Sequence, residues 1–149
     1  MAMTMTGEVQ LAASRETVWA ALNDPEVLKS CIPGCEELNK TSDTEFQAVA
    51  TQKIGPVKAR FKGKVQLTDL DPPNGYKISG EGDGGIAGFA KGGATVALSD
   101  KDGGTLLTYN VEAQIGGKLA QLGQRLINGA AKKVADEFFK NFAKAVAAQ

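Results

Sequence analysis

The chain has 149 residues, and 42% of them are hydrophobic and 23% charged, proportions typical of a globular protein. One domain of residues 1–149 is expected, with a core large enough to fold without disulfide or metal cross-links. The 17 Lys and Arg balance 17 Asp and Glu, which argues against nucleic acid as the main partner, and the absence of histidine excludes Ser-His-Asp triads, Cys-His pairs and histidine-ligated metal sites.

The N-terminal segment predicts one strand followed by two short helices. Residues 4–12 alternate apolar and polar side chains, which is the period of a half-buried strand. Ser14 has the position of an N-cap residue before a first short helix. Asp24 repeats this signal with proline directly after it, and the turn at residues 33–34 ends the second helix.

Between residue 35 and about residue 115 the hydrophobic period is two. The alternation is clearest over residues 57–68, where one face is apolar and the other is basic. Turn-forming residues divide the region into about six strands, at positions 42–43, 55–56, 72–75, 84–85 and 102–104. Connections this short favour antiparallel neighbours.

After residues 116–117 the pattern changes to a helix of about 30 positions. Its apolar stripe comprises Leu119, Leu122, Leu126, Ala130, Val134, Phe138, Phe142 and Val146. A long amphipathic helix needs burial, so we expect the stripe to face the apolar side of the sheet. The element order predicts an α+β helix-grip fold, in which a curved antiparallel sheet of about seven strands surrounds a long C-terminal helix, with two short helices after the first strand.

The inward positions of the predicted strands carry many glycines and alanines. They permit either close packing of the helix on the sheet or an apolar cavity for a small lipophilic ligand. The cavity interpretation predicts a ligand-binding wall of Phe46, Ala48, Phe61, Val65, Ile78, Val96, Tyr109, Val111, Leu122, Leu126 and Phe138. Tyr109 is the one clear hydrogen-bonding side chain of this wall, and a core tyrosine bonded to the backbone is the alternative.

Two further segments are candidates for docking a partner. Cys31, Pro33 and Cys35 belong to a C-x-x-x-C turn, whose thiols fit buried structural residues, a redox pair or a partner-contacting loop. Four cations follow one face of a predicted strand: Lys58, Arg60, Lys62 and Lys64. They fit either a solvated face protected from edge pairing or a docking surface for anionic lipid head groups or an acidic protein.

No catalytic residue, metal or cofactor is predicted. The inward positions include neither paired acids nor an activated nucleophile. Residues 80–85 match G-x-G-x-x-G in letters, but a loop and a strand follow where dinucleotide binding requires a helix. Two cysteines, no apolar leader and no long apolar stretch predict a cytoplasmic location.

Four segments resemble the carbon monoxide dehydrogenase G-subunit (CoxG) family, which belongs to the START and Bet v 1-like superfamily of helix-grip domains. They are residues 17–25 (TVWAALNDP), 31–38 (CIPGCEEL), 55–63 (GPVKARFKG) and 116–127 (GGKLAQLGQRLI). The similarity extends from about residue 3 to residue 145.

The resemblance implies a non-catalytic bacterial or archaeal accessory protein of a molybdenum hydroxylase of the carbon monoxide dehydrogenase type. It implies a hydrophobic small molecule, a quinone or a lipid, as ligand, and the hydroxylase or the inner face of the plasma membrane as a docking partner. Two alternatives stay open. One is a polyketide cyclase or hydrolase-like enzyme of the same superfamily, in which Tyr109 would act with a carboxylate, and the other is an assembly or recruitment factor without a ligand. The sequence does not predict the oligomeric state.

Overall fold

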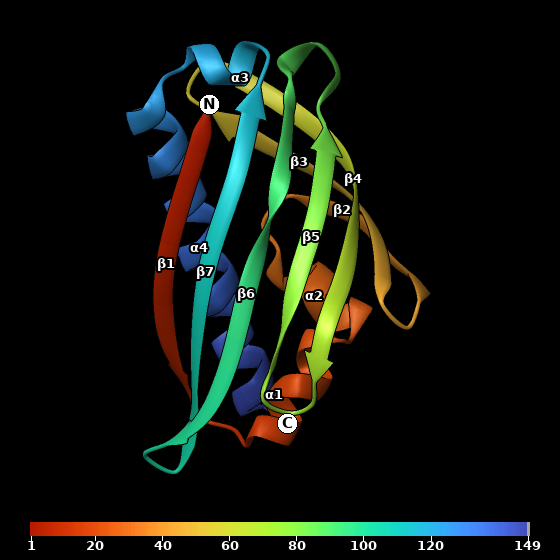
Figure 1. Ribbon diagram of the computed structural model, residues 1–149, viewed down its shortest axis with the longest axis vertical. Helices are drawn as coiled ribbons and strands as arrows, with labels where there is room; N and C mark the ends of the chain where they lie inside the picture. The colour runs from red at the N-terminus through yellow and green to blue at the C-terminus, as the bar shows by residue number, and fades with distance from the viewer. Residues whose placement is uncertain (149) are drawn as a thin grey trace.

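The computed structural model describes residues 1–148 and contains seven strands and four α-helices (Figure 1). In chain order the elements are β1 (Ala2–Leu11), α1 (Arg15–Leu22), α2 (Pro25–Cys31), β2 (Cys35–Ser42), β3 (Glu45–Ile54), β4 (Val57–Asp71), β5 (Gly75–Asp83), the short 3-10 turn η1 (Gly85–Ala87), β6 (Phe89–Lys101), β7 (Gly104–Gly116), α3 (Lys118–Gln121) and α4 (Gln124–Ala147).

The seven strands form one open antiparallel sheet in the order β1-β7-β6-β5-β4-β3-β2. Strands β2 to β7 each pair with their neighbours in the chain, and β1 pairs with β7 and so forms one edge of the sheet. Figure 1 shows α4 along one face of the sheet, with α1 and α2 at the end where the C-terminus lies and α3 at the opposite end. The predicted helix-grip fold is confirmed.

Both short helices begin at the predicted cap residues. The Ser14 hydroxyl accepts a hydrogen bond from the Thr17 amide at 3.2 Å, and the Asp24 carboxylate accepts one from the Glu26 amide at 2.9 Å. Each bond satisfies an amide that has no partner within its own helix. These caps fix where the chain leaves β1 and where it turns toward β2.

The single long C-terminal helix that the sequence predicts is interrupted. The chain forms the short α3, and then Gly123, with φ +91°, separates it from α4. A positive φ of this kind stops a right-handed helix and is accessible to glycine at low cost. The interruption changes the phase of the apolar stripe, so that Ile127 is 4% exposed whereas Leu126 is 38% exposed.

The buried core consists of two separate clusters. The larger one includes Leu11, Val18 and Phe142, and the smaller one consists of Met3, Ile115, Leu119 and Ile127. α4 contributes to both, because Ile127 lies near its start and Phe142 near its end. Its main neighbours are α2, β1, α1 and β3, so α4 approaches the sheet mainly at β1 and β3 and covers it unevenly.

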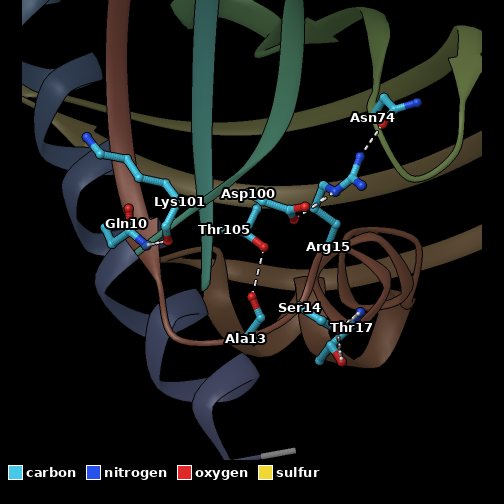
Figure 2. Close-up of polar contacts among 9 residues, drawn as sticks. All are labelled: Gln10, Ala13, Ser14, Arg15, Thr17, Asn74, Asp100, Lys101 and Thr105. Atoms are coloured by element: carbon cyan, nitrogen blue, oxygen red, sulfur yellow. Dashed lines mark hydrogen bonds and ion pairs between the residues drawn. The ribbon is translucent and has the colours of Figure 1, made fainter. Parts of the chain in front are cut away.

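Polar contacts fasten α1 to the end of the sheet near the C-terminus (Figure 2). Arg15 Nε donates to Asp100 Oδ1 at 2.9 Å, and Arg15 Nη1 donates to Asn74 Oδ1. The hydroxyl of Thr105, a fully buried residue, donates to the Ala13 carbonyl at 2.8 Å. The start of α1 is thereby connected to the β4–β5 turn and to both strands of the β6–β7 hairpin.

The buried Tyr76 makes stability depend on pH in the alkaline range. Its side chain is 5% exposed and packs edge-on against Trp19, and burial raises the pKa of its phenol well above the ordinary value. In the unfolded chain this phenol ionises near pH 10, whereas in the folded chain it stays protonated. We expect the free energy of unfolding to fall above pH 10 by up to about 1.4 kcal/mol per pH unit from this group.

Tyr76→Phe tests this expectation. The variant should lose less stability than the parent protein between pH 9 and pH 11, as measured by denaturant unfolding at each pH. If the free energy of unfolding fell equally in both proteins, groups other than Tyr76 would cause the loss of stability at alkaline pH.

Candidate functional site

Small residues occupy two adjacent cross-strand rows on the inner face of the sheet, the face toward α4. The strand register places Ala48, Gly63, Gly82 and Ala90 in one row and Gly80, Gly92 and Ala113 in the next. No side chain longer than a methyl group extends from these positions, so the main chain itself forms a shallow floor.

An apolar groove of about 320 Å³ lies over this floor, and we call it the inner groove. Strands β3 to β7 all contribute to it, and five strands spaced ~4.8 Å apart span about 19 Å. Phe61 and Val111 on its border pack against the smaller core cluster, whereas Val65 and Ile78 pack against the larger one. The inner groove therefore lies between the two clusters, where the core is incomplete.

The structure brings only part of the predicted wall together. Five of the predicted wall residues line the inner groove: Ala48, Phe61, Val65, Ile78 and Val111. Phe46 and Val96 lie in the larger core cluster at 4% and 8% exposure, and Phe138 stacks on Phe142 with ring centroids 5.6 Å apart. Leu122 packs on the smaller cluster and Leu126 is exposed, so that among the described residues none from α3 or α4 lines the groove.

Both interpretations of the small residues apply, at different positions. A Cβ atom at Gly63 would lie 2.7 Å from the Glu81 carbonyl oxygen, so this glycine is required by the close approach of β5. The three atoms nearest to a Cβ atom at Gly82 would all belong to Phe61, the first at an ordinary contact distance of 3.5 Å. Gly82 therefore leaves space that a larger side chain could occupy.

Tyr109 does not contribute a polar group to the inner groove. Its ring lies over Gly7, the residue directly across the β1–β7 pair, and stacks on Phe139 with centroids 5.0 Å apart. Burial, and then the Asp136 carboxylate, raise the pKa of its phenol. Tyr109 lines a second depression, which lies between β1 and α4. The sequence does not predict this position of Tyr109, because its contact with Gly7 depends on the pairing of β1 with β7, two strands that lie far apart in the chain.

The four cations predicted for docking all lie exposed on the outer face of β4, away from α4. Arg60 Nε pairs with Glu36 Oε2 at 3.1 Å, and the pKa of Glu36 is lowered by the Thr51 hydroxyl and by Arg60. Register neighbours of Lys62 and Lys64 are also acidic, Asp83 and Glu81. A depression of about 760 Å³ on this face is larger than the inner groove, but its rim is charged, which suits water or a polar partner.

The turn between Cys31 and Cys35 ties α2 to β3 and α4. Gln52 Nε2 donates to the Pro33 carbonyl at 2.7 Å, and Asn141 Nδ2 donates to the Cys31 carbonyl at 3.1 Å. Cys31 is 1% exposed, so its side chain cannot reach a docking partner. Burial raises the pKa of both thiols, which favours structural cysteines over a reactive thiolate.

Within residues 1–148 no three acidic or cysteine side chains gather in a way that could hold a metal ion. The helices of the same part of the chain include none long and apolar enough to cross a membrane.

Comparison with known proteins identifies relatives along nearly the whole chain. The model of the carbon monoxide dehydrogenase G-subunit (CoxG) family matches residues 7–147. A conserved protein from Geobacillus kaustophilus has 35% sequence identity and a TM-score of 0.90, with 97% of this chain and 95% of that chain covered. None of the curated proteins matches the sequence significantly.

More distant solved structures share the fold alone. An uncharacterised protein from Rhizobium leguminosarum has 16% identity and a TM-score of 0.77, with 100% of this chain and 97% of that chain covered. Ara h 8.0201, a Bet v 1-like protein, has 15% identity and a TM-score of 0.68 with complete coverage of both chains. These neighbours have the same helix-grip fold.

Proposed function

Because the chain belongs to the carbon monoxide dehydrogenase G-subunit (CoxG) family, we propose that it is a non-catalytic accessory protein that carries a quinone or a lipid for a dehydrogenase of this type. The inner groove holds the apolar part of the ligand, and the dehydrogenase is the partner that the protein serves. The structure of the groove and the family membership support this proposal from two independent directions.

The observation that carries the proposal is the incomplete core over the glycine and alanine floor. Monomeric proteins usually fill the space between a sheet and its covering helix to the density of an organic crystal. Here Ala48, Val65 and Ile78 stay partly exposed on the inner face although they lie between two packed clusters. An apolar ligand would complete this core and gain the free energy of apolar burial.

A carrier fits this groove better than an enzyme of the same superfamily. Acid–base or nucleophilic catalysis needs a titratable group that faces the substrate. Tyr109 does not line the inner groove, and alternation along the strands places the exposed side chains of Lys64, Glu81, Lys91 and Glu112 on the outer face. A polyketide cyclase or hydrolase-like reaction therefore has no candidate residue in this groove.

The docking surface in this proposal is the outer face of β4, where Lys58, Lys62 and Lys64 are exposed. Such a face would attract an acidic surface of the dehydrogenase or anionic lipid at the inner face of the plasma membrane. Pro33 and Cys35, which are partly exposed, lie on the neighbouring turn and would extend the contact. The same proposal places the protein in the cytoplasm.

Native mass spectrometry of the freshly purified protein, followed by titration with a short-chain quinone and with a phospholipid, tests the carrier function. We expect either a co-purified lipophilic molecule or saturable binding of one probe at a single site. A protein that binds neither probe yet associates with the purified dehydrogenase would replace the carrier function by assembly or recruitment.

A further inference from the structure

The two edges of the sheet are protected very differently. β2 has two register breaks in its pairing with β3 and is covered by α2. β1 pairs with β7 over ten residues without a break, and it contains one charged residue, Glu8, and neither lysine nor proline. Natural sheets use bulges, charges, proline or covering elements to prevent edge strands from pairing with other chains. β2 combines bulges with a covering helix, whereas β1, which α4 contacts as well, has no bulge, lysine or proline along its free edge.

The free edge of β1 presents a regular set of main-chain groups. Met1 and Ile115 exchange two main-chain hydrogen bonds, at 2.8 and 2.7 Å, and so begin the alternation of the β1–β7 ladder. This alternation directs the amides and carbonyls of Thr4, Thr6 and Glu8 away from β7. Within the described part of the chain no other group bonds to the main chain of these three residues.

A depression of about 370 Å³ runs along this edge, between β1 and α4. Six consecutive residues of β1, from Met3 to Glu8, line one side of it. The other side consists of one flank of α4, with Asn128, Ala131, Lys132 and Asp136. An added strand would therefore find both hydrogen-bonding groups and an adjacent helix.

We propose that the strand added there is β1 of a second copy of this chain, which gives a two-fold symmetric dimer with one continuous sheet. Antiparallel pairing about an axis at Thr6 places Thr6 opposite Thr6 of the second copy and Thr4 opposite its Glu8. Each such pair exchanges two main-chain hydrogen bonds, so the pattern of free groups complements itself. On the inner face the same register places Met5 opposite the glycine at position 7, which has no side chain to oppose it.

The charges beside the edge favour self-association as well. Lys132 Nζ pairs with Asp136 Oδ2 at 2.7 Å on the exposed flank of α4, one turn apart. The two-fold axis reverses the direction of α4 in the second copy. Lys132 of one copy therefore lies toward Asp136 of the other, so opposite charges approach each other. A strand edge and a helix flank form a small interface, so we expect a dissociation constant in the micromolar range.

Analytical ultracentrifugation from micromolar to millimolar protein, with Thr6→Lys beside Thr95→Lys, tests the dimer. Thr6 is exposed on the outer face, so the lysine leaves the β1–β7 pairing intact but places like charges opposite each other on the axis. Thr95→Lys adds the same charge to the outer face of β6, in the interior of the sheet. We expect the first variant to weaken association at least about tenfold and the second to leave it unchanged.

Hydrogen exchange of the unmodified protein provides a second measurement. The amides of Thr4, Thr6 and Glu8 should gain protection as the concentration rises, whereas those of Met3 and Met5 are protected throughout by β7. A protein that stays monomeric at every concentration overturns the proposal and leaves the edge to a strand of a different protein. A dimer that Thr6→Lys does not weaken, or that leaves these three amides unprotected, overturns it by placing the interface elsewhere.

Discussion

Replacing Ala94 with leucine is expected to weaken binding of the quinone or lipid probe at least about tenfold while the fold stays intact. Ala94 lies in the inner groove, with Ile78 and Val111 as its register neighbours on β5 and β7. A leucine side chain at this position would extend into the space that the ligand needs. The apolar area it covers is no longer available, at about 25 cal/mol for each Å² of lost contact. Titration of both proteins with the same probe measures the effect.

Ala97→Leu is the matched control for this variant. Ala97 lies three residues further along β6 and is exposed on the outer face, so the same change adds the same volume outside the inner groove. Equal binding by the Ala94 and Ala97 variants would contradict the inner groove as the ligand site.

The thermal stability of Ala94→Leu adds an independent measurement. If the space over Ala94 is empty, the leucine costs little and the stability stays close to that of the parent. If the space is filled, overpacking should destabilise the fold by about 1–3 kcal/mol. A large loss would therefore favour the close-packing interpretation of the small residues.

Phe142→Ala is expected to cause the largest loss of stability of any variant considered, about 3–5 kcal/mol. Phe142 is fully buried, is the largest fully buried side chain of the core and stacks on Phe138. Its removal leaves a cavity between α4 and the sheet that the surrounding backbone can fill only in part. The melting temperature should fall by roughly 10 °C, which scanning calorimetry would measure.

Phe89→Ala removes the same ring from the outer face of β6, where Phe89 is 45% exposed and lies over Gly116. We expect this control to cost less than about 1 kcal/mol. Similar losses for both variants would contradict the packing of α4 against the larger core cluster.

Local sequence signals predicted most of the fold because each depends on neighbours in the chain. The N-caps at Ser14 and Asp24 and the period of two over residues 57–68 reappear in the structure at the expected positions. The interruption at Gly123 was not predicted, because a glycine within an apolar period is compatible with a continuous helix. Its positive φ is a property of the folded chain.

The site was predicted less completely, because lining a groove depends on contacts between distant segments. Ala48 and Val65 were assigned to the correct face by alternation alone, and strand pairing brings them to the same groove. The path of α4 determines which of the other predicted wall residues are buried in the core instead of lining the groove. It covers Phe46 and Val96 with core packing and leaves the middle of the sheet open, and no local pattern encodes that path.

The division of the core into two clusters has a mechanical consequence. Regions of a protein open and close as cooperative units that follow contiguous apolar contacts. We therefore expect the smaller cluster, with Leu119 and Ile127, to open more readily than the larger one around Phe142, beside which Arg15 bonds to Asp100 and Thr105 bonds to Ala13. A bulky guest could enter or leave through the motion of one half, at a cost well below that of global unfolding. Once bound across both halves, it would join them into a single unit.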